Sequence, residues 1–151
     1  MLFFDHNIIF GSLTNLFLLG WLSLLVACFL KADSKLRHGL LIAGGRVIPL
    51  TLLLYFVIGY FFTRHLPGGM TTFDAVLTSF SVPEKVLLAW FEVIGLALLI
   101  GRWIIDDAQE NQIHMVVVIV CLVGALFAAA LGLVMYLPTR YVLTRKKGTT
   151  A

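Results

Sequence analysis

Charged residues are scarce in this sequence: Asp, Glu, Lys and Arg make up 13% of its 151 residues, whereas hydrophobic residues make up 60%. Soluble domains are about 25% charged and about 45–50% apolar. A single domain of this length cannot bury so many apolar side chains, so most of them must face lipid. The scarcity of charge excludes a water-soluble globule and predicts an integral membrane protein.

Cysteine is also scarce. Cys28 and Cys121 lie in separate apolar stretches and form no CxxC pair, which excludes a disulfide framework and a zinc knuckle. The basic residues gather in two short segments, 31–37 and 140–147. In a membrane protein such clusters usually meet anionic lipid headgroups. We therefore expect the lipid bilayer as a partner and no nucleic acid.

Four apolar runs are long enough to cross a membrane, since about 20 helical residues span about 30 Å of hydrocarbon. They are 8–30, 39–62, 85–105 and 113–137, the last of them ended by Pro138. The pattern predicts an all-α fold: an integral membrane four-helix bundle that forms one transmembrane domain over 1–151. A basic tail, 138–151, follows the fourth helix.

An even number of spans would place both termini on one face, called side A here, and the loops 31–38 and 106–112 on the opposite face, side B. Counting Lys and Arg gives a slight excess on side A, which predicts a cytoplasmic C-terminus. The first run is too long for a secretory signal, and Asp5 precedes it where a signal would carry cations. We expect a retained, multi-pass protein of a prokaryotic inner membrane.

The longest connection, between the second and third runs, contains a short amphipathic segment at 70–80. Its apolar residues Phe73, Val76, Leu77 and Phe80 follow an i, i+3, i+4, i+7 pattern. This spacing predicts a helix on the side A surface, parallel to the membrane.

Two charged residues lie well inside the spans, where charge is costly. Glu92 lies about 9 Å from side A, at the expected depth of Asn15 and Tyr55, and Gly132 opens space nearby. One interpretation is a protonated carboxyl hydrogen-bonded to Asn15 or Tyr55, which would clasp the helices. The other is a role in handling a ligand or a proton.

Arg46, the second of these charges, lies about 9 Å from side B and can reach toward Asp106 and Asp107, so an ion pair is expected there. Glu110 and His114 have i, i+4 spacing at the same edge. We interpret this segment as a solvated turn, with hard-metal or acid–base chemistry as the alternative. The predicted side B polar cluster is Arg46, Arg102, Asp106, Asp107, Glu110 and His114, with no assigned metal.

Several further residues recur in an order that is familiar. They are Asn15 with Trp21; Gly68-Gly69 with Phe73 and Phe80; Leu88-Ala89-Trp90; Gly101-Arg102-Trp103 with Asp107; Ile113-His114; and Gly132-Leu133 with Tyr136. In this order the chain resembles the abscisic-acid-deficient-four-like membrane proteins over nearly its whole length. The resemblance implies four helices and a link to carotenoid chemistry, because plant members take part in making the xanthophyll neoxanthin.

The chain departs from the family pattern at three places. Where members carry a histidine two residues after the tryptophan, it has Glu92; where they carry Phe-Asp, it has Leu96-Ala97; and where they carry Gly-Pro in the last helix, it has Ala129-Ala130. If those groups serve catalysis in the family, this chain has altered the catalytic set.

The leading hypothesis is a membrane protein that binds or modifies an apolar isoprenoid such as a carotenoid. Glu92 is its candidate catalytic residue, and the predicted ligand-lining residues are Asn15, Tyr55, Trp90 and Gly132. If the protein is an enzyme, the resemblance implies a redox-neutral isomerisation that needs no cofactor. The rival is a non-catalytic subunit of a larger membrane complex, favoured by the small residues of the fourth run, Gly124, Ala125, Ala128, Ala129, Ala130 and Gly132.

Overall fold

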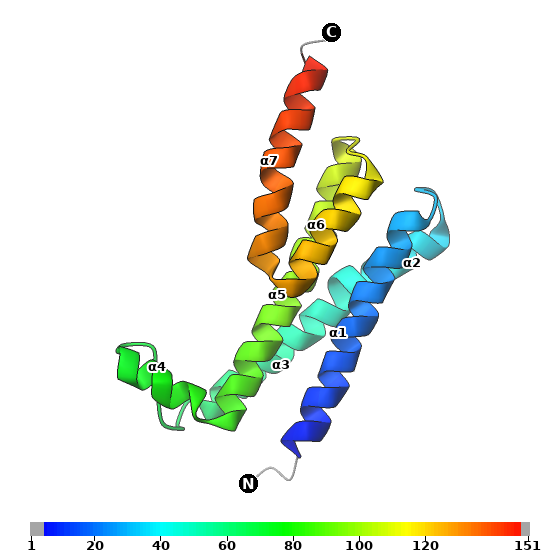
Figure 1. The fold of residues 1–151 in the computed structure, drawn as a ribbon. Coiled ribbons are helices and arrows are strands. Elements are labelled where there is room, and N and C mark those ends of the chain that lie inside the picture. The colour runs from blue at the N-terminus through cyan, green and yellow to red at the C-terminus, as the bar shows by residue number, and fades with distance from the viewer. Residues whose placement is uncertain (1–4, 149–151) are drawn as a thin grey trace.

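The structure is a computed structural model that describes the backbone of residues 5–148 and the side chains of residues 5–145. Over these residues all regular structure is helical, which confirms the all-α class (Figure 1). The helices are α1 (His6–Phe29), α2 (Lys35–Ile42), the π-helical turn η1 (Ala43–Val47), α3 (Ile48–Thr63), α4 (Phe73–Phe80), α5 (Pro83–Glu110), α6 (Met115–Phe127) and α7 (Ala129–Gly148).

Three helices are long and apolar enough to cross a membrane: α1, the continuous helix Lys35–Thr63 formed by α2, η1 and α3, and α5. Local chemistry sets where two of them begin. The Asp5 carboxylate accepts a 2.9 Å hydrogen bond from the amide of Asn7 at the start of α1. Pro83 occupies the first turn of α5, where its missing N–H leaves no bond unmade. Each of the first three predicted spans thus corresponds to a described helix that is long and apolar enough to cross a membrane.

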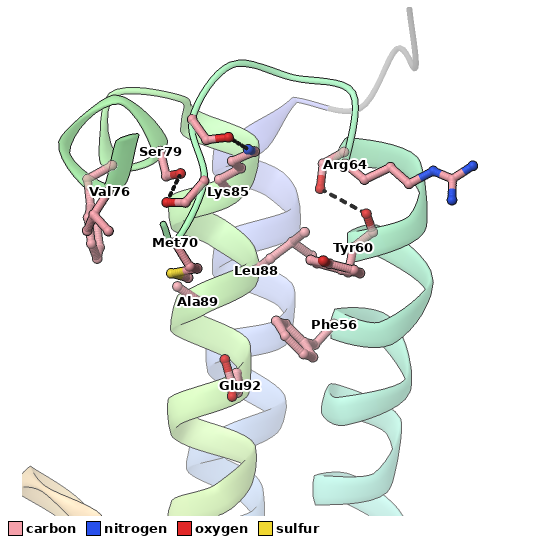
Figure 2. Close-up of a pocket in the computed structure, with 14 residues that line it drawn as sticks. Phe56, Tyr60, Arg64, Met70, Val76, Ser79, Lys85, Leu88, Ala89 and Glu92 are labelled. Carbon is pink, nitrogen blue, oxygen red and sulfur yellow. Dashed lines mark hydrogen bonds between the residues drawn. The ribbon is translucent and has the colours of Figure 1, made fainter. Parts of the chain in front are cut away.

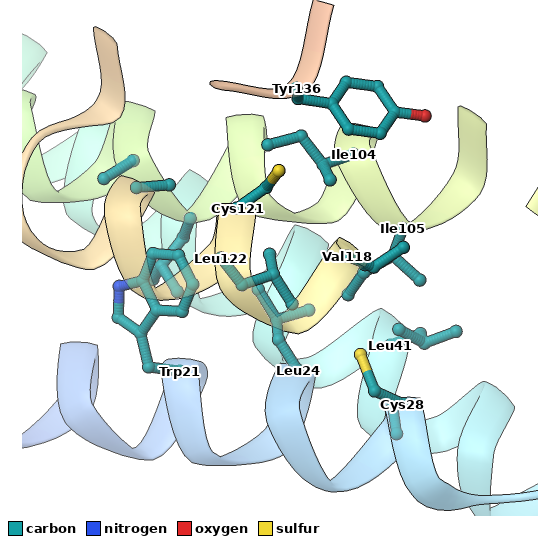
Figure 3. Packing of buried hydrophobic residues seen from close by; sticks show 14 of the residues in the cluster. Trp21, Leu24, Cys28, Leu41, Ile104, Ile105, Val118, Cys121, Leu122 and Tyr136 are labelled. Carbon is teal, nitrogen blue, oxygen red and sulfur yellow. The ribbon is translucent and has the colours of Figure 1, made fainter. Parts of the chain in front are cut away.

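The core lies where α1, α5 and α6 meet toward side B. Figure 3 shows Trp21 and Leu24 of α1 facing Leu122 of α6, with Ile104 and Ile105 of α5 nearby. All five side chains are at most 2% exposed. Much of the remaining apolar surface is exposed, as expected for helices that face lipid.

The prediction of a fourth span, 113–137, is wrong. Helix α6 ends at Phe127, and Ala128 is extended at φ −155° and ψ 125°. From there α7 returns toward side B beside α6, so the two form a helical hairpin (Figure 1). Pro138 does not end a helix but lies inside α7. Over residues 5–148 the fold has three candidate spans and a hairpin that enters from side B, and not four spanning helices.

Small residues let the two helices of the hairpin approach closely. A Cβ at Gly132 would collide with Ala125, and one at Gly124 would come within 2.8 Å of the Met135 sulfur. The 13 residues of α6 reach about 20 Å, short of the hydrocarbon thickness. The hairpin therefore covers only the side B half of α5.

The hairpin changes which ends of the chain lie together. The end of α7 is at the opposite end of the molecule from the start of α1 (Figure 1), so the expectation of both termini on side A is also wrong. Among the residues whose side chains the structure describes, side B has most of the cations: Lys31, Lys35, Arg37, Arg102, Arg140 and Arg145. Arg64 and Lys85 are on side A. The positive-inside rule therefore predicts that side B is cytoplasmic.

The amphipathic segment predicted at 70–80 does contain a helix, although α4 begins only at Phe73. The Thr72 hydroxyl accepts a 3.2 Å hydrogen bond from the amide of Ala75 and so defines that start. Helix α4 is set outside the bundle, at an angle to the side A end of α5 (Figure 1). Phe73 and Phe80 are exposed, and Val76 is half-buried.

Candidate functional site

A pocket of about 300 Å³ lies between α3, α4 and the side A half of α5 (Figure 2). Most of its wall is apolar, and a few polar groups converge on it, as in many ligand sites. The lining residues are Phe56, Tyr60, Thr63, Arg64, Gly68, Gly69, Met70, Val76, Ser79, Phe80, Lys85, Leu88, Ala89 and Glu92.

The rim of the pocket is the loop between α3 and α4, and polar contacts hold it in place. The Lys85 ammonium donates to the carbonyls of Leu66, at 3.1 Å, and Gly68, at 3.4 Å. The Ser79 hydroxyl donates to the carbonyl of Gly69 at 3.4 Å. Gly68 has φ +100°, and a Cβ there would collide with Ser79, so a glycine is required for this turn.

Glu92 lies half-buried in the pocket wall, on α5 (Figure 2). Within the described chain its carboxyl has no hydrogen-bond or ion-pair partner. Asn15 is exposed on α1, and the ring of Tyr55 packs edge-on against Phe91, with centroids 5.5 Å apart. Neither residue forms the expected clasp, because equal depth does not place two side chains on facing helix surfaces.

The other predicted ligand-lining residues also lie away from this pocket. The Trp90 ring packs against Phe10 with centroids 6.0 Å apart, and Gly132 is enclosed in the hairpin. Sequence reasoning missed Tyr60, Arg64 and Lys85, which border the α3–α4 loop. In the sequence, their one distinguishing feature is that they lie at the ends of the second and third apolar runs.

At side B, Asp107 is held by two partners from α7. Its Oδ2 accepts a 2.6 Å hydrogen bond from the Tyr136 hydroxyl and pairs with the Arg140 Nε at 2.9 Å. Asp107 and Tyr136 are both buried. This contact anchors the hairpin to α5, and it could not be foreseen while 113–137 was taken as one helix that crosses to side A.

The expected ion pair of Arg46 with Asp106 or Asp107 does not form. Asp106 pairs with Arg102 at 2.8 Å, one turn away on the same helix, while Arg46 is exposed. Asp106 thus pairs with a residue on its own helix, and Asp107 pairs with a residue on α7. Sequence reasoning also missed Arg37, which is buried and donates to the Gln109 side chain at 2.9 Å and to the Ala27 carbonyl at 3.2 Å.

Glu110 and His114 do not form a joint site. His114 caps α6, its Nδ1 accepting a 3.4 Å hydrogen bond from the amide of Val116, and Glu110 is exposed at the end of α5. Among the described residues no group of three His, Cys, Asp or Glu side chains could hold a metal ion. Residues 111–114 connect α5 to α6.

Comparison with protein families gives one match, to the model described as ABA DEFICIENT 4-like, over residues 8–136. The chain belongs to the ABA DEFICIENT 4-like family. Neither a search of curated proteins nor a search of solved structures found a match. In this ABA DEFICIENT 4-like chain, Glu92, where the resemblance led us to expect a histidine in family members, lies in the pocket wall. Ala129-Ala130, where we expected Gly-Pro in family members, directly follows the break between α6 and α7.

Proposed function

We propose that the protein binds, and chemically alters, one end group of an apolar isoprenoid of the carotenoid class in the pocket between α3, α4 and α5. One observation supports this most: Glu92 is an unpartnered carboxyl in the wall of a largely apolar pocket at membrane depth. An ionisable group at this depth costs free energy, and such groups usually mark functional sites. The family name, which refers to a deficiency of abscisic acid, agrees with isoprenoid chemistry.

The size of the pocket suggests which part of such a molecule enters it. A volume of about 300 Å³ is at the lower end for ligand sites and is too small for a polyene some 30 Å long. Beyond Glu92, Val93 and Leu96 are exposed on α5, on the stretch that leads toward the hairpin. The end group would occupy the pocket, and the chain would lie in lipid along α5.

The chemistry available to one carboxyl is proton transfer. Opening an epoxide ring to an allenic alcohol breaks one C–O bond, adds one proton to the oxygen and removes one proton from carbon. Glu92 can donate the first proton and, as a carboxylate, accept the second. No electrons are exchanged, so the step needs no oxidant or reductant.

Purification in mild detergent with a carotenoid-containing lipid extract tests the proposal. We expect the visible absorption of a polyene to co-purify with the wild-type protein. Glu92→Gln should retain the polyene and abolish its conversion, as followed by chromatography of the extracted pigment. Glu110→Gln, the same change on the exposed end of α5, is the matched control and should behave as wild type. Absence of bound polyene from both the wild-type protein and Glu92→Gln would overturn the proposal.

The rival function, a structural subunit of a larger complex, loses part of its sequence argument. Gly124 and Gly132 pack within the hairpin of this chain, so they no longer indicate a partner helix. A stoichiometric protein that co-purifies without pigment would restore the rival. We further propose a prokaryotic inner membrane as the location, which fractionation of the source cells would check.

A further inference from the structure

We propose a second site, for a phosphate group of an anionic lipid, between Arg46 of η1 and Arg102 of α5 near side B. It is separate from the Glu92 pocket and does not depend on the proposed function. Along their helices, Arg102 lies about 12 Å from the side B end of α5 and Arg46 about 16 Å from the side B end of Lys35–Thr63. From within a membrane, long arginine side chains extend toward the headgroup region.

Arg102 has hydrogen-bond donors that no described group satisfies. Its Nη2 pairs with Asp106, but its Nε and Nη1 are buried and have no partner. Native proteins rarely leave such donors unmet, because desolvation without a partner costs free energy. An acceptor with several oxygens, such as a phosphate, matches the fork of guanidinium donors.

The π-helical turn packs against the Arg102 side chain. The stem of Arg102 lies over Gly45, where a Cβ would collide with it. Arg46 follows directly in the chain and is exposed, with no ion pair among the described residues. Arg46 and Arg37 both lie within Coulombic range of the Arg102 guanidinium. π-Helical turns occur often at functional sites.

The charge balance at this place favours an anion. Arg46 and Arg37 lie within Coulombic range of Arg102, and the Asp106 carboxylate pairs with Arg102 alone, which leaves Arg46 uncompensated. Glu110 borders the open hollow beside Arg102, but it lies two helix turns nearer to side B. The Arg37 guanidinium is already engaged by Gln109 and the Ala27 carbonyl. The two groups with free capacity are therefore Arg46 and Arg102.

Binding of phosphatidylglycerol to the purified protein in detergent, counted by native mass spectrometry, tests this site. Phosphatidylcholine and inorganic phosphate are the comparison probes. We expect phosphatidylglycerol to bind, and Arg46→Gln to weaken it about tenfold, the effect of losing one charge-assisted hydrogen bond. Arg102→Lys retains the charge beside Asp106 but removes the planar fork, and it should weaken binding similarly.

Lys35→Gln is the matched control, because Lys35 is also an exposed side B cation but lies far along the helix from η1. It should leave binding unchanged. If inorganic phosphate displaces phosphatidylglycerol from the wild-type protein, the site binds free phosphate as well as lipid phosphate. Equal binding of phosphatidylcholine, or full binding by both Arg46→Gln and Arg102→Lys, would overturn the proposal.

Discussion

Two carboxylates on the same helix, Glu92 and Asp107, have opposite surroundings. Asp107 is buried under α7 and bound by Tyr136 and Arg140, whereas Glu92 faces a pocket and has no partner among the described residues. The difference follows from the length of the hairpin, which covers α5 near side B and stops before it reaches Glu92. Packing satisfies the carboxylate of Asp107, whereas the carboxyl of Glu92 stays available to the ligand that we propose. The following experiments test this contrast.

The largest effect is expected in topology. Reporter fusions after residues 35, 74 and 140 should place the first and third on one side of the membrane and the second on the other, since α7 returns to side B. Residues 35 and 140 are expected in the cytoplasm. If the reporters at residues 140 and 74 lie on the same side of the membrane, residues 113–137 do cross it. The hairpin would then not explain the different surroundings of Glu92 and Asp107.

Asp107→Ala should destabilise the protein by about 3 kcal/mol or more, because it leaves Arg140 and the Tyr136 hydroxyl without their shared partner. Thermal unfolding in detergent, followed by circular dichroism, measures this loss. Glu92→Ala is the matched comparison and should change stability by less than about 1 kcal/mol, since it breaks no bond. Equal losses from the two variants would contradict the contrast.

Gly132→Leu should lower stability by about 1–3 kcal/mol through overpacking against Ala125. Ala130→Leu adds a larger side chain only two residues away, at an exposed position, and should have little effect. The same unfolding measurement separates them. If both were tolerated, the close approach of α6 and α7 would not be what holds the hairpin.

The smallest effect is expected from Tyr136→Phe, about 1 kcal/mol. The variant removes one hydrogen bond to Asp107, while Arg140 still pairs with the carboxylate and the ring still packs edge-on against Trp103. In the double variant with Asp107→Ala, Tyr136→Phe should cause little further loss of stability, because both changes break the same hydrogen bond. Full additivity in the double variant would mean that Tyr136 acts elsewhere.

The sequence predicted the three long spans and the amphipathic helix at α4, because hydropathy and periodicity are local properties. It did not predict the hairpin. The break at Ala128 has no proline or glycine beside it, and Pro138, the expected end, lies within α7. The bonds that support the return join Asp107 to residues 29 and 33 positions later, a separation that no local pattern reveals.

Part of the candidate site was also predictable. Depth counting singled out Glu92, since any carboxyl within an apolar run stands out, and the pocket contains it. The same counting chose Asn15 and Tyr55 as partners, and the structure brings neither to it. Depth fixes one coordinate of a side chain, while rotation about the helix axis depends on the packing of the whole bundle.

The hairpin also bears on how the chain is made. Synthesis proceeds from the N-terminus, so α5 enters the membrane with Asp107 before Tyr136 and Arg140 exist. During that interval the carboxylate must stay at the aqueous edge of side B, where water solvates it. We therefore expect the final seating of α5 in the membrane to wait until α7 folds back onto it.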